Sequence, residues 1–121
     1  MGRNSHDGSY YRFVEMENIA KVYFLRAKFY KENPNLLNNE KNKDVRKINK
    51  IDKACNVLCD PYKTIIKNTF FEKKNLYWWE GFYPKTTYYR LRDKAIQTFL
   101  LAYKLQWNIK LTFYCYHLWL L

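Results

Sequence analysis

Residues that break helices are scarce in this chain, and their positions divide it into long uninterrupted segments. Only three glycines and three prolines occur among the 121 residues. Glycine and proline are the residues least compatible with the interior of a helix. The prolines stand at Pro34, Pro61 and Pro84, so the stretches between them are long enough for complete helices. Because strand signal is weak before residue 109, the sequence predicts an all-α fold, a bundle of helices.

The first segment, residues 10–32, has the pattern of a helix with two apolar stripes. The main stripe recurs in steps of three and four residues, at Phe13, Met16, Ala20, Tyr23, Ala27 and Tyr30. A second, adjoining stripe contains Val22, Leu25 and Phe29. Two stripes are more than one small core can cover, so residues 13–30 are predicted to form an interface, in a homo-oligomer or with another protein. Asn33-Pro34 ends this helix, and an Asn-rich linker over residues 33–43 follows.

Residues 44–106 are predicted to form one domain with three further helices. The first starts with Asp44 as its cap and has an apolar face of Val45, Ile48, Ile51, Cys55 and Leu58. Asp60-Pro61 starts the second, with Asp at the cap and Pro at the first helical position. The predicted inward residues of that helix are Tyr62, Ile65, Ile66 and Phe70. Pro84 opens the last helix, which runs to about Trp107 with a core face of Tyr88, Leu91, Ala95, Phe99 and Ala102.

The remaining segment, residues 107–121, is an apolar tail. Apolar and polar residues alternate imperfectly from Ile109 onward, so a strand and a helix extension both stay open. Its uncharged part, residues 111–121, is shorter than the roughly 20 residues that a membrane-spanning helix needs, so we predict burial in the protein and no membrane. Residues 1–9 contain no apolar signal region, and three cysteines are an odd number for disulfides. Reduced thiols and a cytoplasmic location are therefore predicted.

Basic residues outnumber acidic residues two to one. Lys and Arg number 22 and Asp and Glu 11, which makes the formal net charge +11. An excess of this size favours a polyanionic partner such as nucleic acid. In the helix that starts at Asp44, the face opposite the apolar one contains Arg46, Lys47, Lys50 and Lys53.

Signs of catalysis and of metal binding are weak. The chain has two histidines and two serines, no Gly-rich phosphate loop and no carboxylate pair that stands out. We therefore predict that it is not an enzyme and needs no cofactor. A zinc-binding set can be drawn from Cys55, Cys59, Cys115 and His117. It lacks the tight spacing of structural zinc sites, so the favoured interpretation of the cysteines is small buried hydrophobic residues, with no metal.

The strongest functional signal lies in residues 54–99. Residues 54–70, ACNVLCDPYKTIIKNTF, resemble the start of region 4 of sigma-70-type factors, where a helix ends in a Leu, a Pro-containing break follows and a Tyr-basic-x-Val-Ile helix begins. Residues 83–99, YPKTTYYRLRDKAIQTF, resemble the recognition helix of the same module. They are most similar to the small phage-type late transcription regulators of the ArpU family, whose pattern is a Ser/Thr-rich turn, Tyr-Tyr-Arg, then Ala-Ile or Ala-Leu and an aromatic residue.

This resemblance implies a helix-turn-helix protein that binds double-stranded DNA, regulates transcription and contacts RNA polymerase. Only residues 75–82 are available for the helix before the recognition helix. We therefore expect one or two turns there, held by bulky Trp rings. Trp78 and Trp79 are accordingly assigned to the core and not to a base-stacking platform.

The N-terminal residues of a recognition helix read base edges, and flanking cations neutralise phosphates. The predicted base contacts are Lys85, Thr86, Thr87, Tyr89 and Arg90. The predicted phosphate contacts are Arg92, Lys94, Lys47, Lys50 and Lys53. Two alternatives stay open: a non-enzymatic basic module that binds RNA or the ribosome, and a protein-interaction subunit that pairs through its N-terminal helix.

Overall fold

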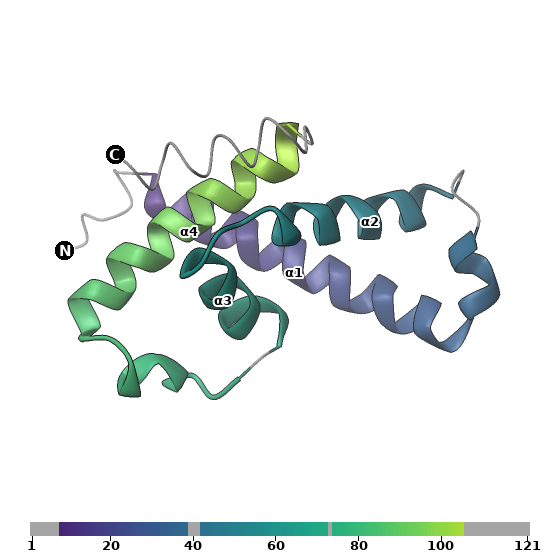
Figure 1. Ribbon diagram of the computed structural model, residues 1–121. Helices are drawn as coiled ribbons and strands as arrows, with labels where there is room; N and C mark the ends of the chain where they lie inside the picture. The colour runs from purple at the N-terminus through teal and green to yellow at the C-terminus, as the bar shows by residue number, and fades with distance from the viewer. Residues whose placement is uncertain (1–7, 39–41, 73, 106–121) are drawn as a thin grey trace.

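Every regular element of the structure, a computed structural model that describes residues 8–38, 42–72 and 74–105, is helical (Figure 1). The α-helices in these ranges are α1 Ser9–Glu32, α2 Lys43–Asn56, α3 Tyr62–Ile66 and α4 Lys85–Leu105. Shorter elements join them: the 3-10 helices η2 Pro34–Asn38 and η4 Trp78–Gly81, and the π-helix η3 Lys67–Phe71, which continues α3. The predicted all-α fold is confirmed for the described part of the chain.

Helices α1 and α2 form a hairpin that turns at η2 (Figure 1). Asn42 caps α2, because its side-chain oxygen accepts hydrogen bonds from the backbone N–H groups of Asp44 and Val45 at 2.8 and 3.4 Å. The prediction of Asp44 as the cap is wrong. Asp44 lies in the first turn of the helix, where its carboxylate pairs with Arg26 of α1 at 2.8 Å. The predicted linker is partly helical, since η2 occupies its first half.

The apolar faces predicted for α1 and α2 lie in the core, with one exception. The predicted inward residues of α2 are buried, as is Leu58 just after it. In the main stripe of α1, Met16, Ala20 and Tyr30 are buried, and its other members are half-buried. The second stripe differs, because Leu25 and Phe29 remain 70% and 52% exposed. These two side chains are accessible, as an interface requires, and the homo-oligomer stays a prediction.

Helix α4 packs against the other three α-helices, most extensively against α3. Its predicted core face is buried except for Leu91, which is half-buried. Ile96 and Leu100 are buried as well, so α4 is covered on more than one side. The start of α3 differs from the prediction: the helix begins at Tyr62, and the Asp60 carboxylate accepts a hydrogen bond from the Thr64 hydroxyl at 2.9 Å without capping a backbone N–H group.

Several predictions fall on residues outside the described ranges, among them the apolar tail 107–121 with Cys115 and His117. Within those ranges, Cys55 is a free, buried thiol and Cys59 is disulfide-bonded, so the prediction of a reduced thiol is confirmed for Cys55 and wrong for Cys59. No helix there has the length and apolar character to cross a membrane. The same ranges contain no cluster of three or more side chains that could hold a metal ion.

Candidate nucleic-acid interface

A single 3-10 turn, η4, stands where the sequence predicts a short helix before α4. Trp79 of this turn is 6% exposed and lies flat against the Tyr88 ring, with centroids 4.6 Å apart and planes 7° apart. The Trp78 indole N–H donates to the Thr69 hydroxyl at 3.2 Å, and Thr69 also shares a 2.8 Å hydrogen bond with the Tyr88 hydroxyl. The prediction of a short turn held by Trp rings is confirmed, and these rings fix the start of α4 on η3.

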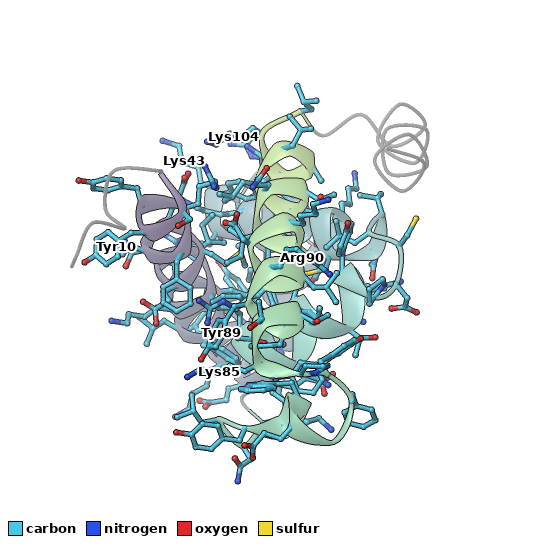
Figure 2. All side chains as sticks on the ribbon, turned by 90° about the vertical axis from the view of Figure 1, so that its left-hand side faces the viewer. Tyr10, Lys43, Lys85, Tyr89, Arg90 and Lys104 are labelled. Atoms are coloured by element: carbon cyan, nitrogen blue, oxygen red, sulfur yellow. The ribbon has the colours of Figure 1, made fainter. Side chains whose placement is uncertain are left out.

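The N-terminal half of α4 presents most of the predicted base-contacting side chains to solvent (Figure 2). Lys85, Thr86, Tyr89 and Arg90 are exposed, and Thr87 is half-buried. Lys94, a predicted phosphate contact, is exposed one turn beyond Arg90. Since neighbours on a helix surface are three or four residues apart, the exposed side chains form one surface, which we call the α4 stripe: Lys85, Thr86, Tyr89, Arg90 and Lys94.

Arg92 differs from the α4 stripe because aromatic rings hold its guanidinium group. The group lies 4.5 Å from the centre of the Phe13 ring of α1 and 4.7 Å from the centre of the Tyr89 ring. The Tyr89 ring packs in turn against Trp79 at 5.9 Å and against Tyr88 at 5.3 Å. Tyr89 is therefore both a support for Arg92 and, at 40% exposure, a surface that a ligand can touch.

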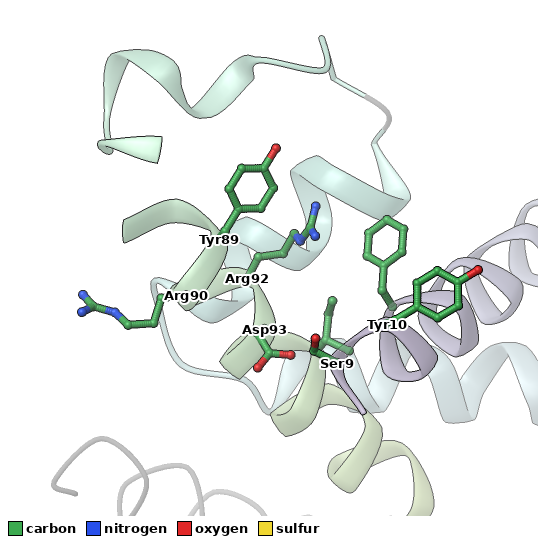
Figure 3. Close-up of a pocket in the computed structure, with 8 residues that line it drawn as sticks. Ser9, Tyr10, Tyr89, Arg90, Arg92 and Asp93 are labelled. Atoms are coloured by element: carbon green, nitrogen blue, oxygen red, sulfur yellow. The ribbon is translucent and has the colours of Figure 1, made fainter. Parts of the chain in front are cut away.

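The first turn of α1 lies beside α4, next to Arg92 (Figure 3). Arg12 pairs with Asp93 at 3.3 Å, across 81 residues of sequence. Gly8 precedes the helix with a φ of 82°, a left-handed value that favours glycine. A Cβ atom there would also approach the Arg12 guanidinium to 3.1 Å. Sequence reasoning missed this contact, because no local pattern relates residues so far apart.

Lys50, one of the predicted phosphate contacts of α2, lies far from residues 85–90. Lys47 and Lys53 are exposed, and Lys50 is half-buried with its ammonium group 4.6 Å from the centre of the Tyr103 ring. At 1.5 Å per residue, Tyr103 lies about 21 Å beyond Tyr89 along α4. This distance is more than twice the Debye length of about 8 Å at physiological salt. Lys50 therefore acts only weakly on a ligand at the start of α4.

Two titratable groups in the core between α1 and α2 are held neutral. The Tyr23 hydroxyl donates to the Asp52 carboxylate at 2.8 Å, and burial together with this carboxylate raises the pKa of Tyr23 well above its ordinary value of 10.0. Burial, and then the negative charge of Asp52, raises the pKa of Cys55 from 9.0 to about 12. A thiol with such a pKa is protonated at physiological pH, so Cys55 is not an activated nucleophile.

No protein-family model, no curated protein and no solved structure matches this chain.

Proposed function

We propose that this protein is a transcription regulator that binds double-stranded DNA sequence-specifically through the N-terminal half of α4. The observation that carries the proposal is the exposed α4 stripe on a rigid base of stacked aromatic rings. From Lys85 to Lys94 the stripe is about 14 Å long, which suits a major groove about 12 Å wide. The resemblance of residues 54–99 to sigma region 4 also supports the proposal, and the single turn η4 stands in the place of the helix before the recognition helix.

Within this proposal the side chains have separate roles. Arg90 is exposed, and a guanidinium can donate two hydrogen bonds to the O6 and N7 atoms of guanine. Lys85, Thr86, Thr87 and Tyr89 contact neighbouring bases, whereas Arg92 and Lys94 contact phosphates. The α2 cations Lys47, Lys50 and Lys53 are assigned to the general attraction for DNA, because Lys50 lies near Tyr103, at the other end of α4.

The proposal includes a cytoplasmic location. Resemblance to sigma region 4 extends it to contact with RNA polymerase. Purification of the tagged protein from its own cells, with and without nuclease treatment, tests this extension. Polymerase that is retained after nuclease treatment supports a direct contact. Retention of ribosomal RNA in place of polymerase and promoter DNA contradicts it.

The central test separates base readout from charge. Duplexes are selected from a random library, and the wild-type protein is measured on a selected duplex and on a scrambled one. Arg90→Ala should reduce the difference in binding free energy between the two by about 1–3 kcal/mol. Arg46→Ala removes another exposed arginine, from the outer face of α2, and should leave the difference unchanged. A wild-type protein without any duplex preference after selection would contradict the proposal.

A basic RNA-binding module is the second candidate function, and exposed rings beside α4 favour it. Tyr77 and Phe82 are exposed in the loop that leads into α4, and Lys74 in the same loop is also exposed. Aromatic side chains next to cations bind single strands by stacking with the bases. If this function is correct, the protein prefers single-stranded RNA to every selected duplex, and Phe82→Ala weakens that binding.

A further inference from the structure

A hollow of about 460 Å³ lies between the first turn of α1 and the N-terminal half of α4 (Figure 3). Its walls include Tyr10 and Phe13 from α1 and Tyr89, Arg92 and Asp93 from α4. Figure 3 shows Tyr10 and Arg92 on the same side of α4, whereas Arg90, which also lines the hollow, points to the opposite side. The Arg90 guanidinium, which is proposed to read guanine, is thus directed away from Tyr10 and Arg92.

The Arg92 guanidinium is positioned to bind an anion in this hollow. The Phe13 and Tyr89 rings lie against it at 4.5 and 4.7 Å. Among the described residues it makes no hydrogen bond or ion pair. An arginine stacked on aromatic rings keeps the N–H donors at its edge available, and their fork geometry matches the oxygens of a phosphate.

The Asp93 carboxylate in the wall of the hollow repels an anion only weakly, because Arg12 compensates its charge. Asp93 pairs with Arg12 at 3.3 Å and accepts a hydrogen bond from the Gln97 amide at 3.1 Å. The Arg12 Nε atom is buried and has no hydrogen-bond partner among the described residues. Arg12 therefore compensates the charge of Asp93, and Arg92 adds a positive charge in the wall of the hollow.

We infer that this hollow binds a phosphate of the DNA backbone, so that the first turn of α1 is a second DNA-contacting element beside α4. Arg92 donates hydrogen bonds to the phosphate oxygens, and the Tyr10 ring covers the adjoining sugar. The inference rests on the proposed function, because it places the phosphate next to the groove that the α4 stripe enters.

The test uses the selected duplex in a series in which one backbone phosphate at a time is replaced by an uncharged methylphosphonate. Wild-type binding should weaken at several positions. Arg92→Ala should bind the unmodified duplex about tenfold more weakly, as expected for loss of a charged hydrogen bond. The same variant should become insensitive to the methylphosphonate at one position only. Arg90→Ala should keep its sensitivity there, because its lost contact is to a base.

The outcomes separate the inference from the proposed function. If Arg92→Ala keeps the wild-type sensitivity at every position, the hollow does not bind a phosphate, although DNA binding stands. If the wild-type protein binds no duplex, the proposed function fails and the inference fails with it. Circular dichroism and thermal unfolding establish whether Arg92→Ala is folded.

If Arg92→Ala does not fold, alanine variants of two neighbouring tyrosines test the inference instead. Tyr10 and Tyr11 are 55% and 64% exposed, but Tyr10 lines this hollow, whereas Tyr11 lines a different one beside Tyr103. Tyr10→Ala should reduce the effect of the methylphosphonate at one position severalfold, and Tyr11→Ala should leave it unchanged. Equal behaviour of the two variants overturns the inference.

Discussion

The start of α4 and the outer face of α2 are two cationic surfaces with different support. On α4 the side chains project from a helix that Trp79 and Tyr88 fix in place, and Arg92 beside them lies against two rings. On α2, Lys47 and Lys53 extend from an amphipathic helix into solvent. A cation in a fixed position can discriminate between ligands, whereas a mobile one adds to the general field. The placement of charges, more than their number, therefore distinguishes the two surfaces.

The largest effect is expected where the support of α4 is removed. Trp79→Ala deletes a buried ring that stacks on Tyr88 at 4.6 Å. The free energy of unfolding should fall by about 3–5 kcal/mol, as for other large core truncations. Urea denaturation measures the loss. Tyr77→Ala, in the exposed part of the same loop, should change it by about 0.5 kcal/mol or less. Similar losses in the two variants would show that the stack does not support α4.

Alkaline pH should lower the free energy of unfolding, because the buried Cys55 thiol of α2 is neutral in the folded protein. The folded-state pKa of Cys55 is about 12, raised from 9.0 by burial and then by Asp52. The stabilisation from the neutral thiol is complete below pH 9 and is lost as the pH rises toward 12, at most about 1.4 kcal/mol per pH unit. Thermal unfolding of wild type and Cys55→Ala between pH 8 and about pH 10.5 tests this. A parallel pH dependence in both proteins would exclude Cys55 as the cause.

The cap of α2 should have a smaller effect. Asn42→Ala removes the acceptor for two backbone N–H groups at the start of the helix and should cost about 1 kcal/mol. Asn49→Ala is the control, because Asn49 is exposed within α2 and alanine is favourable in a helix. The measurement is the urea midpoint of each variant. If only Asn49→Ala destabilises, Asn42 is not the functional cap.

The smallest effects directly compare the two cationic surfaces. Lys94→Ala should reduce the slope of log K against log salt by about one, as for loss of a single phosphate contact. Lys50→Ala should change the slope less, because Lys50 lies near Tyr103, at the other end of α4. Titrations of the selected duplex at several salt concentrations give both slopes. A larger change for Lys50→Ala would place the DNA along α2.

Local patterns predicted the inward faces of the helices but not the positions that depend on tertiary contacts. The inward residues of α2 are spaced by three and four, so they could be found from the sequence. Asn42 and Asp44 are both favourable N-cap residues, so the sequence does not show which of them caps α2. The difference depends on a tertiary contact, because Asp44 pairs with Arg26 of α1. Arg92 resembles a solvated cation in the sequence, because its ring partner Phe13 lies on a distant helix.

The pairing of Arg12 with Asp93 bears on when the hollow between α1 and α4 can form during synthesis. The two residues are separated by 81 positions, and a ribosome releases α1 and α2 long before α4. The hollow between α1 and α4 cannot form until Asp93 has left the exit tunnel. Chains that terminate before α4 lack Arg92 and Asp93 and therefore cannot form this hollow.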